Sequence, residues 1–415
     1  MTPANPKQSA FVKPTLLTFL FLAGLAIHAT AQEPTPPTPP SPSAPATVPT
    51  NTAKAAPEAA AATPPSAPTW SVGPIDFSGL VDGYYSYNFN TPATRSGGNQ
   101  LRNFDYDANS FSLNMAKLTM AHDPDPVGFR VDLGFGKAFN TILASEPNFT
   151  HLEQAFVSFK PTKAKGFEAD FGEFVSSAGA EVIETKDDWN YSRSLLFSIV
   201  TPYYHVGLRT SMPITKSFTG GVQVVNGWNS FSDNNTGKTL GFTGVYTKPK
   251  YTLSGNYYTG PENTGTNKGF RNLLDSTLLL SPTAKFNAYI NYDYVQNRNA
   301  VQLTPTSYVT GSLDHVSGVA FAARYQATAT VAFAGRVEYL GDGTSPGSAI
   351  GSGAHQKLNE FTLTAEYKVP EGMLVRTEYR RDGADQPYFN KDSASLVKGQ
   401  STLEVGVVAF FGPKR

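Results

Sequence analysis

The pattern nearest to an enzyme site is a serine placed between two glycines. Residues 343–347 are Gly-Thr-Ser-Pro-Gly, with Ser345 at the centre, and His355 follows a few residues later. A nucleophilic serine in this pattern requires a sharp turn from a strand into a helix, which presents its hydroxyl to a substrate. Here the serine lies in a stretch rich in glycine and serine between two strand-like segments. We therefore expect no catalytic residue and no enzyme, and a hydrolase using Ser345 and His355 remains an alternative.

A second group of candidate residues lies in the longest of the predicted loops, residues 175–202. Its charged side chains include Glu181, Glu184, Asp187, Asp188 and Arg193. Carboxylates and arginines that face each other across a narrow passage sort solutes by charge. We therefore predict a constriction loop here, with a solvated outer loop as the alternative. The carboxylates lack the regular spacing of a Ca²⁺ loop, so no metal site is expected.

Composition narrows the classes of function further. Cysteine is absent, which excludes thiolate zinc sites, and the six histidines show no ligand pairing. No cofactor is expected. Lysine and arginine together equal aspartate and glutamate at 33 each, so the formal net charge is zero and nothing indicates a nucleic-acid partner.

The elements that must position these residues are strands. Residues 75–411 alternate apolar and polar side chains, and very short turns alternate with long loops such as 297–313 and 382–400. This asymmetry is typical of an all-β, antiparallel, up-and-down transmembrane β-barrel with short periplasmic turns and long extracellular loops. We predict about sixteen strands, at 76–89, 110–122, 128–138, 151–160, 166–174, 203–212, 217–228, 239–248, 251–260, 270–280, 285–296, 314–326, 330–340, 357–368, 373–381 and 401–411.

Alternation also assigns the faces of the strands. A charged side chain facing lipid costs roughly 2–4 kcal/mol at the bilayer midplane, so the charged face of each strand should line the lumen. The predicted lumen wall comprises Arg130, Asp132, Arg324, Arg336, Glu338, Glu366, Lys368, Arg376, Glu378 and Arg380.

The N-terminus indicates export. Lys7 and Lys13 precede an apolar run, and Ala29-Thr30-Ala31 has the small-residue pattern of a cleavage site, which predicts a signal peptide over residues 1–31. Residues 32–70 are rich in proline, alanine and threonine and should form a disordered periplasmic linker. We expect the mature chain in the outer membrane of a Gram-negative cell.

The chain resembles the β-barrel porin family of OmpL-like outer-membrane proteins. The resemblance rests on the opening residues 77–85, Phe-Ser-Gly-Leu-Val-Asp-Gly-Tyr-Tyr, and on the central segments 180–183, 190–197 and 202–207. It covers the whole predicted barrel and implies the role of a porin.

We therefore predict a porin for passive diffusion of small hydrophilic solutes or ions through an aqueous channel. Besides a hydrolase, the alternative is a surface adhesin or structural barrel that does not conduct. The expected partners are outer-membrane lipid, the barrel-assembly machinery and the solutes themselves. The sequence leaves a monomer and a homotrimer open.

Overall fold

The computed structural model describes residues 70–413 apart from 95–96, 305–306, 344–349, 351, 353–354, 371 and 394. These residues belong to one compact unit. The predicted signal peptide and all of the predicted linker except Trp70 lie outside the described residues, so both remain predictions.

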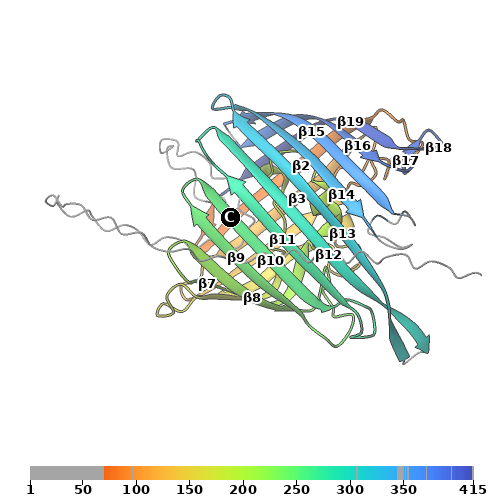
Figure 1. Ribbon diagram of the computed structural model, residues 1–415. Coiled ribbons are helices and arrows are strands. Elements are labelled where there is room, and N and C mark those ends of the chain that lie inside the picture. Colours follow the sequence, from red (N-terminus) through yellow and green to blue (C-terminus); the bar gives the residue numbers. More distant parts are fainter. Residues whose placement is uncertain are drawn as a thin grey trace, which may run out of the picture. The chain divides into compact units, whose positions relative to one another are not determined.

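Sixteen antiparallel strands form a closed barrel (Figure 1). Each strand pairs with the next along the chain, and the last pairs back with the first, as in Thr402 opposite Asn88. The sixteen strands are β2 (Ile75–Asn88), β3 (Ser110–His122), β4 (Val127–Phe135), β5 (Leu152–Phe159), β6 (Glu168–Val175), β7 (Tyr204–Pro213), β8 (Phe218–Val225), β9 (Thr239–Lys248), β10 (Tyr251–Pro261), β11 (Phe270–Leu280), β12 (Phe286–Thr304), β13 (Ser307–Gln326), β14 (Val331–Asp342), β15 (Gln356–Val369), β16 (Met373–Ala384) and β19 (Gly399–Phe411). The predicted fold class and strand number are confirmed.

Short elements complete the described chain. β1 (Ser71–Val72) forms a tight hairpin with the start of β2, and β17 (Phe389–Lys391) pairs with β18 (Ser395–Val397) in the loop before the last strand. Three helical segments interrupt the long loops: α1 (Lys137–Ile142), the single 3-10 turn η1 (Thr185–Asp187) and the π-helical turn η2 (Leu196–Val200).

One predicted loop is largely strand. The expectation of a long loop over 297–313 is wrong because β12 continues to Thr304 and β13 begins at Ser307. After a register shift near Arg298, the two strands go on pairing with each other, as in Val301 opposite Val309. β11 pairs with β12 only as far as Asn297, so the hairpin of β12 and β13 extends past its neighbour (Figure 1, lower right). Polar and apolar residues alternate weakly there, which is why the sequence did not indicate strands.

The two faces of the wall differ as their alternation predicts. On β14, Phe333, Val337 and Tyr339 are about half exposed, whereas Arg336 is 1% exposed. The exposed residues point away from the barrel and suit contact with lipid. The charged residues between them point into the barrel, where other protein groups cover them.

The apolar core lies inside the barrel. Its members include Phe104, Phe139, Tyr191 and Phe197, all from segments between strands. Two inward glycines make room for these rings: a Cβ on Gly134 would lie 2.0 Å from the Phe139 ring, and one on Gly406 would lie 2.1 Å from Tyr191. The connecting segments therefore fold into the barrel and pack against its wall.

Candidate constriction inside the barrel

The connection between β6 and β7, residues 176–203, crosses the lumen. We call this segment the inner loop; it matches the predicted constriction loop to within one residue. At one side, Ser177 donates to Asn256 of β10 over 2.9 Å. At the other, Glu184 is ion-paired to Lys117 of β3. β3 and β10 lie on nearly opposite sides of the sixteen-stranded ring, so the inner loop spans it.

Two carboxylates of the wall hold the backbone of the inner loop. Glu378 of β16 accepts hydrogen bonds from the backbone N–H groups of Tyr191 and Ser192, at 2.6 and 3.0 Å. Glu338 of β14 accepts them from Leu195 and Leu196, at 3.0 and 3.3 Å. Hydrogen bonds to a charged acceptor are stronger than neutral ones, so these four contacts fix the loop at its centre.

Three buried arginines of the wall donate to the same segment. Arg336 contacts the Glu181 carboxylate at 2.6 Å and the Ser192 carbonyl at 2.8 Å. Arg376 donates to the carbonyls of Thr185, Asp188 and Asn190, and Arg380 donates to that of Arg193. Five donors on a planar guanidinium allow one side chain to satisfy several carbonyls that no strand partner can reach.

A third attachment lies at β2. Asp82 is completely buried and accepts hydrogen bonds from the hydroxyls of Tyr191 and Thr185, both at 2.6 Å. Asn114 of β3 donates to the same carboxylate at 2.7 Å. This cluster anchors the inner loop beside the strand pair β2–β3.

The five charged residues predicted to form the constriction lie in different surroundings. Glu181, Asp188 and Arg193 are buried: Glu181 contacts Arg336, and Asp188 lies 3.0 Å from Arg193. The side chains of Glu184 and Asp187 keep 16% and 18% of their surface exposed. Only these last two can act on a passing ion at short range, so the carboxylates do not form one continuous charged edge.

Glu184 has the electrostatics of an anchor. Burial alone would raise the pKa of its carboxyl group, but Lys117 and Lys186 outweigh burial and hold the pKa below its usual value. The side chain therefore stays ionised and remains paired with Lys117 at neutral pH.

The ten residues of the predicted lumen wall all lie on strands, and most of them pair with one another or with the inner loop. Arg324 and Arg376 both contact Glu366, at 2.8 and 2.7 Å. Arg130 lies 3.0 Å from Asp132. Among these ten, Arg130, Arg324 and Lys368 are only half-buried, whereas Asp132, Arg336, Glu338, Glu366, Arg376, Glu378 and Arg380 are buried.

Sequence reasoning missed several residues of this network: Asp82, Lys117, Glu153, Glu360 and Asp382. Asp82 lies between Val81 and Gly83, and Lys117 lies between Ala116 and Leu118. A charge between apolar neighbours in a strand was a usable signal for an inward position. Glu153 could not be assigned by alternation, because a register shift between β4 and β5 leaves it without an opposite residue and changes its face.

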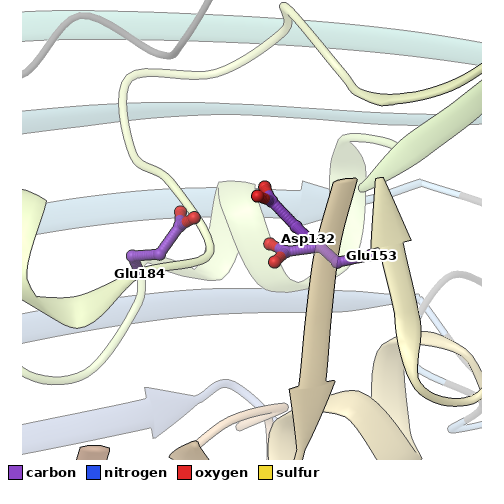
Figure 2. Close-up of side chains that lie close together, drawn as sticks. All are labelled: Asp132, Glu153 and Glu184. Atoms are coloured by element: carbon purple, nitrogen blue, oxygen red, sulfur yellow. The ribbon is translucent and has the colours of Figure 1, made fainter. Parts of the chain in front are cut away.

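Three carboxylates approach one another where the inner loop meets β4 and β5. One oxygen from each of Asp132, Glu153 and Glu184 lies within 4.8 Å of the others (Figure 2). The Lys117 ammonium contacts all three, at 3.0 Å from Asp132, 2.7 Å from Glu153 and closely to Glu184. Because the ammonium contacts all three carboxylates, this triad is an ion-pair anchor for the inner loop.

The serine pattern gains no support from the structure. Ser345 lies outside the described residues, and His355 is exposed just before β15. The hydrolase alternative therefore stays a prediction. Among the described residues, no helix is long and apolar enough to cross a membrane.

A closed sixteen-stranded barrel with an apolar outer band, a charged inner face and an infolded loop defines the class of outer-membrane porin-like barrels. The family described as "Putative beta-barrel porin-2, OmpL-like" matches residues 74–411, and the chain belongs to this family. No curated protein matches the chain in sequence.

Solved outer-membrane proteins share the fold. OmpT of Vibrio cholerae is 13% identical with a TM-score of 0.52, and the match covers 83% of this chain and all of that one. The outer-membrane channel DcaP of Acinetobacter baumannii is 10% identical with a TM-score of 0.53, covering 81% and 97%. The anion-selective porin from Comamonas acidovorans is 10% identical with a TM-score of 0.51, covering 81% and 99%. At these identities the likeness concerns the fold alone.

Proposed function

We propose that this protein is an outer-membrane porin through which small hydrophilic solutes and ions diffuse, and that the inner loop sets the width and charge of the passage. The supporting observation is the attachment of the inner loop to nearly opposite walls, at Asn256 of β10 and Lys117 of β3. A loop held across a barrel of this strand number narrows an aqueous channel without closing the barrel itself. Such a role requires no covalent catalysis.

Charge at the passage comes from the residues that keep some exposure. Within the inner loop and the predicted wall, the half-buried charged groups are Lys186, Glu184 and Asp187 of the loop and Arg130, Arg324 and Lys368 of the wall. Arg130 and Arg324 are ion-paired with Asp132 and Glu366, so discrimination between ions should depend on the pair at the inner loop, Lys186 and Asp187, rather than on the wall.

A second candidate function is a barrel that does not conduct and serves as an adhesin or structural anchor. The observation in its favour is dense packing within the lumen: Arg193, Arg336, Arg376 and Arg380 are among the largest fully buried side chains. Wall residues of an open channel would be expected to retain contact with water.

The experiment that separates the two is a planar-bilayer recording of the refolded protein. A porin gives repeated steps of conductance, and the steps should disappear when the protein is boiled before insertion. A barrel that is folded by gel mobility but electrically silent would refute the porin proposal and support the adhesin.

We further propose that the mature protein is inserted in the outer membrane after cleavage of residues 1–31, and that it assembles as a homotrimer. OmpT of Vibrio cholerae is known in a trimer form and shares the fold with a TM-score of 0.52. Cross-linking in native membranes tests the assembly, since a monomer band alone would contradict it.

A further inference from the structure

Glu173 of β6 is a buried carboxylate without a partner. Glu173 is 2% exposed, and neither of its carboxylate oxygens accepts a hydrogen bond from any described residue. Most other buried carboxylates of the barrel, such as Glu338 and Glu378, are held by arginines or backbone N–H groups. An ionised carboxylate in such a place is strongly unfavourable unless something else neutralises it.

The nearest charges to Glu173 are negative. Ala155 of β5 lies opposite Glu173 in the last recorded pair of the two strands, and Glu153 stands two residues earlier on β5. The negative charges of Glu153 and Glu146 both repel a negative charge on Glu173.

Glu153 has a free oxygen of its own. Its Oε2 atom lies 2.7 Å from the Lys117 ammonium, but its Oε1 atom is buried without a hydrogen-bond partner among the described residues. Glu153 also belongs to the carboxylate triad of Figure 2.

The charges of this region do not balance. Asp132, Glu153, Glu173 and Glu184 supply four carboxylates, whereas the cations that contact the triad are Lys117 and Arg130. Lys186 also acts on Glu184, but it is paired with Asp187. When all four carboxyl groups are ionised, two negative charges remain, which is the charge that one divalent cation would neutralise.

We propose that Glu153 and Glu173 bind a hard divalent cation, with Ca²⁺ the best match. The ligands are carboxylate oxygens, which suit Ca²⁺ and Mg²⁺ rather than transition metals. Ca²⁺ accepts six to eight oxygens in flexible geometry and can complete its shell with water, whereas Mg²⁺ demands near-ideal octahedral geometry. The site lies beside the Lys117 triad and does not require displacement of that ammonium.

Such a site would stiffen the attachment of the inner loop. Glu153 contacts Lys117, which in turn holds Glu184 of the inner loop. A bound cation would fix Glu153 on the side away from Lys117 and so hold the ammonium in place. The proposal concerns ion binding by the folded barrel and does not depend on conduction.

The test uses the refolded full-length protein, stripped with EDTA and then given Ca²⁺. Equilibrium dialysis with radioactive calcium should find one ion per barrel. Ca²⁺ should also raise the temperature at which heating converts the folded form into the unfolded form, measured by the change in gel mobility. Glu173→Gln should weaken Ca²⁺ binding by roughly tenfold or more and abolish the rise in temperature. Without Ca²⁺, the same variant should be at least as heat-resistant as the native protein, because it removes an unpaired buried charge.

Glu168→Gln is the matched control. Glu168 is a buried carboxylate on the same strand, but it is paired with Lys160 at 3.1 Å, and its variant should bind Ca²⁺ like the native protein. Absence of Ca²⁺ binding by the native protein up to about 10 mM, above the range of extracellular Ca²⁺ modules, would overturn the proposal. Unchanged binding in Glu173→Gln would overturn it too, and Glu153→Gln provides the second variant if the first does not fold.

Discussion

Arg336 is ion-paired with three glutamates. It lies 2.6 Å from Glu181 of the inner loop, 3.1 Å from Glu338 and 3.3 Å from Glu360. Removing one partner from a buried ion network leaves the others uncompensated, which typically costs about 3–5 kcal/mol. Arg336→Met should therefore lower the free energy of unfolding by about that amount, measured by urea unfolding of the barrel in lipid vesicles.

The matched control is Arg381→Met on β16. Arg381 is exposed on its strand and donates to Ser401 near the rim, so its replacement should change the free energy of unfolding by less than about 1 kcal/mol. Equal losses in the two variants would mean that the buried network does not hold the inner loop.

Single charged residues of the inner loop should also determine which ions the channel prefers. Asp187 and Lys186 are paired and partly exposed within the inner loop, whereas Glu181 and Asp188 are buried anchors and unsuitable for this test. Asp187→Asn leaves Lys186 unbalanced and should shift the reversal potential in a salt gradient toward anions. Lys186→Gln should shift it toward cations. A charge at a narrow point acts on ions at short range, where water screens it less.

The pair Lys238–Asp233, in the connection between β8 and β9, serves as a comparison because Asp233 is about as exposed as Asp187. Asp233→Asn removes the same charge, but salt screens charges beyond roughly 8–10 Å, so the reversal potential should hardly change. If Asp187→Asn and Lys186→Gln shift the potential in the same direction, or not at all, the inner loop is not the selectivity element.

At the scale of elements, the fit of the inner loop against the wall depends on Gly406 of β19. A Cβ there would lie 2.1 Å from the Tyr191 ring, far inside contact distance, so Gly406→Ala should displace the inner loop. We expect larger single-channel conductance and a lower unfolding temperature. Gly335→Ala on β14 is the control, since its Cβ would meet Leu363 at 3.4 Å. Unchanged conductance in Gly406→Ala would show that Tyr191 does not limit the passage.

The elements also show what sequence could predict. Strand alternation gave β3, β9 and β11 with the bounds that the structure has, because lipid on one side and charge on the other impose a period of two. No such periodicity in the sequence indicates which residues of a loop contact a distant strand of the wall. The pairing of Glu181 with Arg336, 155 residues apart, depends on barrel closure and could not be read from either neighbourhood. The helix α1 was missed because it has only six residues, too few to show a helical period, and Phe139 packs beside Gly134 at the end of the preceding strand β4.

At the scale of the whole molecule, closure of the barrel lies within residues 75–411. β19 pairs with β2 from Phe411 opposite Gly79 to Thr402 opposite Asn88, and no pairing between described strands uses a residue before Ser71. The proline-rich tract before it has the composition of a segment that cannot bury a core.

Deleting residues 34–68 should therefore leave the barrel able to fold and insert. The measurement is gel mobility of the unboiled protein from outer-membrane fractions, where a folded barrel and its boiled form migrate differently. The deleted form should keep this difference and the same urea midpoint as the full chain, because every described strand and every anchor of the inner loop remains. A smaller deletion of residues 75–79 should abolish the folded form, since it removes Gly79 and its closing pair with Phe411. Loss of the heat-resistant form in the linker deletion would mean that the tract takes part in assembly rather than serving as a spacer.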